Sequence, residues 1–154
     1  MRREFLIVEE QSHSGQYVLV VEDNEDDERL TRRALKQSLA SPRIEVIRDG
    51  GEALDLLQRW PFGAGDEPER PALVLLDLKL PKVSGHEILD AFRAHEPTRE
   101  IPIVIVTSSD EETDIRTAWN LGADDYLKKP LDYFEYMAAV DSVVRMWLPQ
   151  VVHA

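Results

Sequence analysis

The chain has 154 residues, 43% of them hydrophobic, a formal net charge of −12 and no cysteine. This length predicts one domain, and the apolar content suffices for a hydrophobic core. The negative charge disfavours nonspecific binding to nucleic acid or to an anionic membrane, and the lack of cysteine excludes disulfides, thiolate zinc sites and cysteine nucleophiles.

Two similar apolar runs stand near the start, Phe5–Val8 and Tyr17–Val21, and two acidic residues follow each. Only the second run leads into an amphipathic helix pattern, so we predict the first core strand at 17–23 and an N-terminal arm or extra strand at 1–16. The first run is too short for the core of a signal peptide. No apolar run reaches the roughly 18 residues of a membrane span. We therefore expect a cytoplasmic protein without a membrane segment.

Strand and helix patterns alternate along the rest of the chain. In the first half we expect a helix after Asp23, a strand at Ile44–Ile47, a helix at Gly51–Trp60 and a loop at 61–71. A strand at Ala72–Leu76 and a helix capped by Ser84 follow, and then a strand at Ile103–Val106 and a helix with a Ser109–Glu112 capping box. The last elements are a strand at Asp125–Lys128 and a long helix from Leu131.

Continuous apolar strands, rather than alternating ones, indicate a parallel sheet covered on both faces. Five strand–helix units of this kind predict an α/β class protein with a flavodoxin-like (βα)5 fold. Its doubly wound parallel sheet has strand order 2-1-3-4-5. The domain is expected at 17–148, with a C-terminal tail at 149–154.

Chemically capable side chains follow four of the five predicted strands. Glu22 and Asp23 end the first strand, Asp77 the third and Thr107 the fourth, and Lys129 follows the fifth. Ligands of doubly wound sheets bind beyond the carboxyl ends of the strands, so these groups are expected along one rim. Each residue alone fits a cap, a turn or a surface position. Their joint placement favours a site.

The chemistry of these groups suits phosphoryl transfer. Three carboxylates in close contact raise one another's pKa, and Mg²⁺, with its preference for oxygen ligands, relieves the repulsion. A carboxylate such as Asp77 can attack phosphorus and form an aspartyl phosphate. A metal ion and Lys129 can neutralise the transferred charge, and the Thr107 hydroxyl can donate to a phosphoryl oxygen.

Five stretches in a fixed order carry a family signature: Val20–Asn24, Leu75–Pro81, Ser84-Gly85, Val106–Ser109 and Gly122–Pro130. Over residues 17 to 147 the chain resembles the receiver domains of bacterial response regulators. The resemblance implies that Asp77 is the phosphorylation site. It also implies that Glu22, Asp23 and Asp77 hold Mg²⁺ (or Mn²⁺), with Asp23 the more direct ligand of the acidic pair and the backbone carbonyl of Lys79 as a further ligand.

The resemblance assigns the remaining roles at the rim. Thr107 resembles the switch hydroxyl, and Tyr126 the switch aromatic residue. Lys129, which directly precedes Pro130, resembles the lysine that stabilises the phosphoryl group, whereas Lys128 does not. A cis peptide bond is expected at Pro130.

As a response regulator, the chain would accept a phosphoryl group from a sensor histidine kinase. It would then switch the face formed by its fourth helix, fifth strand and fifth helix. Its catalysis would be limited to its own phosphorylation and dephosphorylation. Arg48-Asp49-Gly50, the long loop before the third strand and Trp147-Leu148-Pro149 resemble regulators paired with bacterial phytochromes, so the kinase is expected to be a bacteriophytochrome. No DNA-binding output domain is expected after the final helix, and output would pass through a partner or self-association.

The residue pattern of the final helix predicts one apolar stripe that faces the core, and a surplus of further apolar residues that this stripe does not include. The stripe comprises Tyr133, Tyr136, Met137, Val140, Val144 and Trp147, and the surplus comprises Phe134, Leu148, Val151 and Val152. The surplus residues either pack on the domain or form a homodimer interface. In the second case Phe134, Trp147 and Leu148 are the candidate interface residues.

Three other functions are considered. A phosphohydrolase of the haloacid-dehalogenase-like type needs a second acid two residues after Asp77, where Lys79 stands. An EF-hand loop at Asp23–Glu28 needs glycine at its sixth position, where Glu28 stands. A receiver that binds partners without phosphorylation would not require the complete residue set at the rim.

Overall fold

The computed structural model describes residues 17–38, 41–61 and 69–148. The N-terminal arm at 1–16, the tail at 149–154 and the apolar residues Val151 and Val152 lie outside the described residues. No helix within the described ranges is long and apolar enough to cross a membrane.

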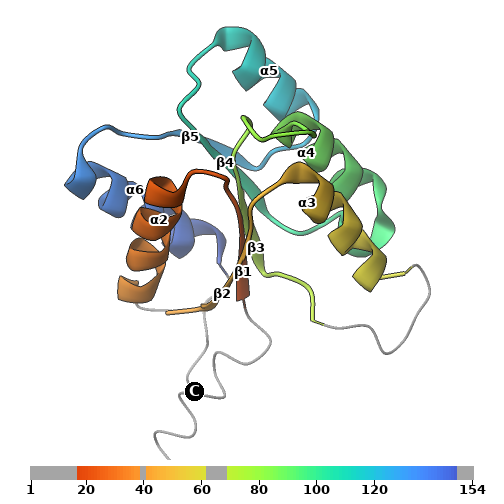
Figure 1. The fold of residues 1–154 in the computed structure, drawn as a ribbon, viewed down its shortest axis with the longest axis horizontal. Coiled ribbons are helices and arrows are strands. Elements are labelled where there is room, and N and C mark those ends of the chain that lie inside the picture. The colour runs from red at the N-terminus through yellow and green to blue at the C-terminus, as the bar shows by residue number, and fades with distance from the viewer. Residues whose placement is uncertain (1–16, 39–40, 62–68, 149–154) are drawn as a thin grey trace, which may run out of the picture.

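A parallel five-stranded sheet forms the centre of the described structure (Figure 1). Its strands are β1 (Tyr17–Val21), β2 (Arg43–Ile47), β3 (Leu73–Leu76), β4 (Ile103–Thr107) and β5 (Asp125–Lys128). The order is β2-β1-β3-β4-β5, and every pair is parallel. The predicted flavodoxin-like fold is therefore confirmed, and each strand lies within about two residues of its predicted bounds.

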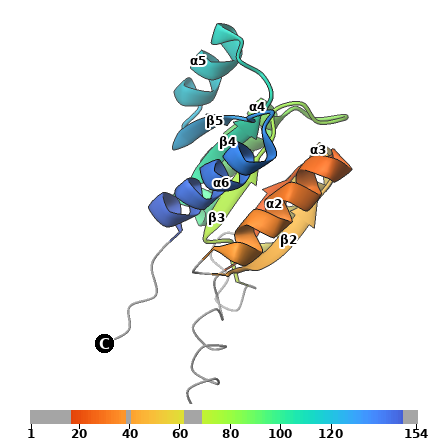
Figure 2. The same ribbon diagram turned by 90° about the vertical axis from the view of Figure 1, so that its left-hand side faces the viewer.

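Helices cover both faces of the sheet. The helices α2 (Glu25–Gln37) and α6 (Tyr133–Trp147) lie side by side on one face, as Figure 2 shows. The helices α3 (Gly50–Leu56), α4 (Gly85–Ala94) and α5 (Glu112–Asn120) lie on the other. Two short 3₁₀ turns, at Leu57–Arg59 and Glu96–Thr98, follow α3 and α4.

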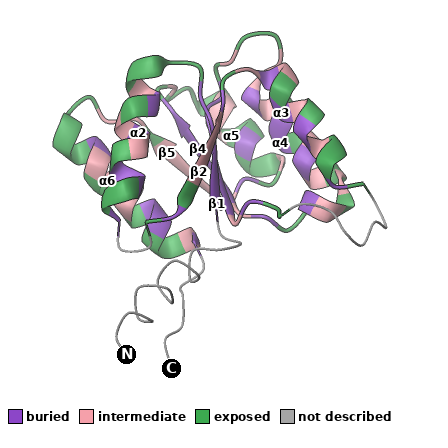
Figure 3. Cartoon of the chain, turned by 60° about the horizontal axis from the view of Figure 1, so that its bottom comes forward, coloured by how far each residue is buried: buried purple, intermediate pink, exposed green. Residues whose placement is uncertain are grey.

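The sheet divides the hydrophobic core into two clusters, because alternate strand residues face opposite sides. In β1, Leu19 and Val21 belong to the cluster under α3, α4 and α5, while Val18 and Val20 belong to the cluster under α2 and α6. Buried positions accordingly line the inner side of both helix layers in Figure 3. This two-sided burial explains why the strand sequences are continuously apolar.

Capping side chains begin α2, α3, α4 and α6, but not α5. Ser84 and Glu87 form a capping box at α4, so the predicted Ser84 cap is confirmed. The predicted Ser109–Glu112 box is wrong. The helix α5 begins only at Glu112 with Glu111 as its N-cap, and the Ser109 hydroxyl instead donates to Asp114 at 2.6 Å.

Two further predictions on helices need correction. The helix predicted at Gly51–Trp60 leaves α geometry after Leu56 and continues as a 3₁₀ turn, and Trp60 at its end is fully buried. Leu148 was a candidate interface residue, but it is only 2% exposed because it packs in the cluster under α2 and α6. Trp147 is half-buried there and donates to Asp125 at 3.1 Å.

Candidate functional site

The three predicted carboxylates converge at the carboxyl end of the sheet. One side-chain oxygen each of Glu22, Asp23 and Asp77 lies within 4.8 Å of the others. Glu22 and Asp77 are buried, whereas Asp23 is exposed. Carboxylate oxygens at this separation are a donor set that suits a hard dication such as Mg²⁺ or Mn²⁺. The cluster reaches solvent through Asp23.

Strand register brings these residues together. Val21 pairs with Leu76 across β1 and β3, so the residues after each strand emerge next to one another. The amide of Asp77 extends this ladder by donating to the Val21 carbonyl at 3.0 Å. The Glu22 carboxylate accepts a hydrogen bond from the backbone N–H of Asn24, two residues further along the chain, at 3.1 Å.

Lys129 occupies the centre of the acidic rim. Its ammonium donates to Glu22 at 2.8 Å, to Asp77 at 3.1 Å and to Asp27 at 2.7 Å. Lys128 instead pairs with Asp110 on the surface at 3.1 Å. The structure thus places Lys129, and not its neighbour, beside Asp77.

Asp27 is the residue at this rim that the sequence did not single out. In the sequence it is only one of several acids in the first turn of α2. No spacing in the sequence identifies this contact, because Asp23 precedes the N-cap Asn24 and the side-chain spacing of a helix therefore does not relate Asp23 to Asp27.

The pKa values at the rim reflect competition between burial and pairing. Burial raises the pKa of Glu22 to about 7, helped by the charge of Asp77 and opposed by the hydrogen bond from Lys129. Burial by itself would lower the pKa of Lys129, but the hydrogen bonds to Asp27 and Glu22 and the charge of Asp77 outweigh it and raise that pKa. The ammonium is therefore firmly charged at neutral pH.

Thr107 and Tyr126 lie on the neighbouring strands β4 and β5. Thr107 is fully buried, and its hydroxyl accepts a hydrogen bond from the Ser109 amide at 3.4 Å. The Tyr126 hydroxyl donates to the Ser109 carbonyl at 2.9 Å. Both residues thus contact the loop between β4 and α5, and no hydrogen bond joins Thr107 to Asp77 in the described part of the chain.

Lys79 lies beside the acidic cluster. Its amide donates to Asp77 at 3.3 Å, and its ammonium lies 3.4 Å from the carboxylate of Asp114. The hydrogen bond from Ser109 is the largest influence on Asp114 and, with the charge of Lys79, lowers the pKa of this carboxyl against the opposing effect of burial. The role of the Lys79 carbonyl toward a metal stays a prediction.

The expected cis bond before Pro130 is wrong, because the described residues contain no cis peptide bond. An X–Pro bond favours trans by about 0.5–1 kcal/mol, so cis needs compensating contacts. In the trans form the Lys129 amide already donates to the Thr107 carbonyl at 2.7 Å, and the side chain already reaches the rim.

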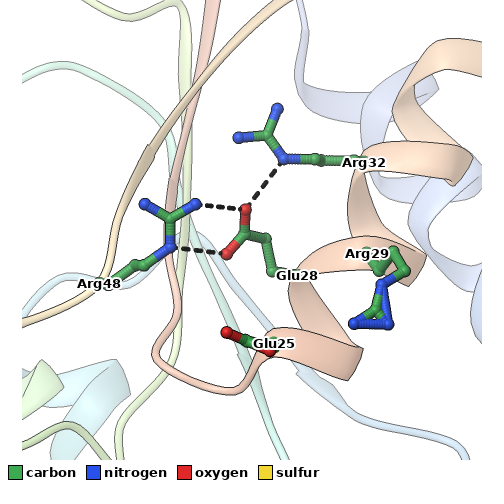
Figure 4. A pocket seen from close by; sticks show the side chains of 5 residues that line it. All are labelled: Glu25, Glu28, Arg29, Arg32 and Arg48. Carbon is green, nitrogen blue, oxygen red and sulfur yellow. Dashed lines mark hydrogen bonds and ion pairs between the residues drawn. The ribbon is translucent and has the colours of Figure 1, made fainter.

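A second charged cluster lies next to the rim, in a pocket that Arg48 and α2 line (Figure 4). The Arg48 guanidinium binds the Glu28 carboxylate through two hydrogen bonds, of 2.9 and 2.8 Å, and Arg32 adds a third of 3.0 Å. Burial opposes ionisation of Glu28, but these hydrogen bonds outweigh it and lower its pKa. The Arg48-Asp49-Gly50 motif thus ties the start of α3 to α2, a contact that sequence spacing did not reveal.

The comparisons with known proteins agree with this geometry. The family profile described as "Response regulator receiver domain" matches residues 18–141. The probable methanogenesis regulatory protein FilR2 of Methanothrix harundinacea is 39% identical over 131 residues, which are 85% of this chain and 83% of that protein.

Two similar proteins have solved structures. Response regulator Rcp1 of Synechocystis is 32% identical over 142 residues, 92% of this chain and 95% of that protein. Its Mn²⁺-bound structure superposes with a TM-score of 0.77, 33% identity and coverage of 90% and 98%. The phosphorylated cyanobacterial phytochrome response regulator RcpA gives a TM-score of 0.77, 32% identity and coverage of 86% and 93%.

The acidic cluster of Glu22, Asp23 and Asp77 fits the divalent-metal binding of receiver domains. The fold, the family match and the homology to phytochrome response regulators agree with one another. The chain belongs to the response-regulator receiver family.

Proposed function

We propose that this protein is a phosphorylation switch in which Asp77 takes a phosphoryl group from a sensor histidine kinase. The observation that carries this proposal is the Lys129 ammonium, which lies 3.1 Å from the buried carboxylate of Asp77 and 2.8 Å from the buried carboxylate of Glu22. A lysine at this place neutralises charge where a phosphoryl group would arrive. The homology to RcpA, whose structure is of a phosphorylated protein, supports the same function.

In this mechanism a side-chain oxygen of Asp77 attacks the phosphorus of a kinase phosphohistidine. The new O–P bond forms as the N–P bond breaks, and the imidazole leaves as the neutral base because its other ring nitrogen has taken up a proton from solvent. Glu22, Asp23 and Asp77 would hold Mg²⁺ or Mn²⁺, which supplies charge neutralisation at the phosphoryl oxygens. Lys129 supplies the remaining positive charge, and the Thr107 hydroxyl donates to a phosphoryl oxygen.

The switch follows from the loop between β4 and α5. When Thr107 turns toward the phosphoryl group, the loop that carries Ser109 moves with it. Tyr126 donates to the Ser109 carbonyl and therefore shifts its position. The two states differ at the face of α5, β5 and α6, and phosphorylation shifts the population between them.

Incubation with acetyl phosphate and Mg²⁺ tests the assignment. Intact-mass measurement should show one added phosphoryl group on the wild type and none on Asp77→Asn. Asp90→Asn, an exposed change on α4, is the matched control and should gain the same mass as the wild type. Equal labelling of Asp77→Asn and wild type would rule out Asp77 as the acceptor.

We further propose a bacteriophytochrome as the kinase and the cytoplasm as the location of the reaction. The Arg48-Asp49-Gly50 motif and the homology to RcpA support the kinase assignment, and the absence of cysteine is compatible with a reducing compartment. The measurement is phosphotransfer from a purified phosphorylated phytochrome kinase compared with non-phytochrome kinases of the same organism. Faster transfer from a non-phytochrome kinase would contradict this choice.

Output through a homodimer is part of the same proposal. Phe134 is 76% exposed at the start of α6 and stacks edge-on against Tyr133, with ring centroids 5.1 Å apart. Leu131 beside it is fully exposed. These residues form an apolar patch that a second copy could cover, whereas the net charge of −12 disfavours nucleic acid as the partner.

Sedimentation velocity at micromolar concentration tests the dimer, with and without phosphorylation. Phe134→Ser should shift a dimer toward the monomer. Met146→Ser removes an apolar side chain of similar exposure, 69%, near the other end of α6, and should leave the oligomeric state unchanged. A wild type that remains monomeric in both states would contradict the dimer.

A further inference from the structure

Asp27 reaches the rim from the first turn of α2. The turn is fixed by Asn24, whose side chain accepts a hydrogen bond from the Asp27 amide at 2.9 Å. The Asp27 carboxylate then meets the Lys129 ammonium at 2.7 Å, the shortest of the three contacts of that ammonium. The side chain is 30% exposed, so this contact lies between the buried rim and solvent.

The ammonium has three N–H donors and three carboxylate partners, so each donor is used. Its side chain is 9% exposed, which leaves little access to water as a substitute partner. Two of the partners, Glu22 and Asp77, belong to the cluster that suits a divalent cation, and Asp27 does not. If Glu22 and Asp77 bound the Lys129 ammonium and a divalent cation at the same time, these two positive charges would lie close together and repel each other.

We propose that Asp27 is the positioning residue for Lys129, which keeps the ammonium beside Asp77 when Glu22 and Asp77 turn to the metal. The inference rests on the proposed phosphoryl-acceptor function. Without Asp27, Lys129 would depend on Glu22 and Asp77 alone and would compete more strongly with Mg²⁺ for them. Asp27 therefore favours metal binding although it is not a metal ligand.

A plainer role for Asp27 is that of an acid near the N-terminus of α2, where negative charge stabilises the helix dipole. A comparison with Asp26 distinguishes the helix-dipole role from the positioning role. It lies in the same turn and carries the same charge, but its side chain is 85% exposed and pairs with Arg29 at 3.3 Å instead of Lys129. Asp26→Asn is thus the matched control for Asp27→Asn.

The experiment is calorimetric titration of the full chain with Mg²⁺, with circular dichroism to establish folding. Asp27→Asn should weaken Mg²⁺ binding about fivefold, and Asp26→Asn less than about twofold, as expected for losing one partly exposed charge-assisted hydrogen bond. Asp27→Glu should restore most of the affinity. In a Lys129→Met background, Asp27→Asn should change the affinity by less than about twofold, because the coupling runs through the lysine.

A second readout is the initial rate of phosphorylation by acetyl phosphate at saturating Mg²⁺. This rate should fall in Asp27→Asn and recover in Asp27→Glu. Equal effects of Asp27→Asn and Asp26→Asn on Mg²⁺ affinity would overturn the inference. An effect of Asp27→Asn on Mg²⁺ affinity that is as large in the Lys129→Met background as in the wild type would overturn it too. A wild type that neither binds Mg²⁺ nor accepts a phosphoryl group would instead refute the proposed function.

Discussion

Glu22 and Glu28 are buried carboxylates whose pKa values shift in opposite directions, because their partners differ. Glu22 shares a single ammonium with two other acids, so burial and repulsion prevail and its pKa rises. Glu28 receives three guanidinium hydrogen bonds, which prevail over burial. At the residue scale, the number of hydrogen bonds that a buried carboxylate receives from cationic side chains decides whether its ionised form destabilises or stabilises the fold.

The lowered pKa of Glu28 predicts a pH-dependent contribution to stability. The folded-state pKa lies below the ordinary value of 4.5, so the contribution is fully present above that pH and is lost as pH falls through the folded-state pKa. Glu28→Gln should cost about 1–2 kcal/mol of unfolding free energy at pH 7, a figure reduced for the exposure of its arginine partners.

Urea unfolding at pH 7 and at pH 3 measures this difference. The cost of Glu28→Gln should shrink at the lower pH, because the carboxyl of the unfolded wild type, with its ordinary pKa of 4.5, is then protonated and the advantage of the ionised form in the folded state declines. Glu25→Gln changes an acid that lines the same pocket and should cost less than about 0.5 kcal/mol at both pH values. An equal cost of Glu28→Gln at both pH values would show that Glu28 is not held ionised by its arginines.

At the scale of elements, the first turn of α4 packs directly on the chain that leaves β3. The Gly85 amide donates to the Leu78 carbonyl at 3.0 Å. A Cβ at Gly85 would overlap the Asp77 carbonyl oxygen and lie 2.6 Å from Leu78 Cα. Since both obstacles are backbone atoms, only glycine permits this approach, and the helix start thereby fixes the position of Asp77.

Gly85→Ala should therefore affect both stability and function. Overpacking against backbone should lower the unfolding free energy by about 1–3 kcal/mol, and the displaced strand end should slow phosphorylation of Asp77 by acetyl phosphate. In Gly51→Ala the nearest atom to the new Cβ is the Asp49 side chain, at 3.3 Å, so its effect on stability should stay within about 1 kcal/mol. Normal phosphorylation of a folded Gly85→Ala protein would contradict this coupling.

At the scale of the whole molecule, strong negative charge and the acidic rim link stability to divalent cations. A ligand that binds only the folded state stabilises it by mass action, by about 2.7 kcal/mol at a concentration 100 times its dissociation constant. MgCl₂ should therefore raise the melting temperature of the wild type. Asp23→Asn should reduce this rise, because it removes one carboxylate of the cluster.

Thermal melts in MgCl₂ and in NaCl of equal ionic strength separate binding from screening. Screening of the net charge of −12 stabilises the compact state in either salt. The Mg²⁺-specific part of the rise in melting temperature is the difference between the melting temperatures in the two salts. A rise of the same size in NaCl would show that the rim contributes no specific metal binding.

The sequence by itself determined the order and type of the elements, the doubly wound sheet and the strand ends that carry Asp77, Thr107 and Lys129. These features follow from local patterns, since continuous apolar runs mark buried parallel strands and the topology brings their carboxyl ends to one rim. Family motifs then separated Lys129 from Lys128.

Only the tertiary structure decided which charged residues meet. The Asp27–Lys129 contact joins residues 102 positions apart, and the Glu28–Arg48 contact joins residues 20 positions apart. It also decided that Leu148 is buried in the core. No periodicity encodes these contacts, because a side chain's partner depends on how helices dock on the sheet and on which neighbour can neutralise it away from water.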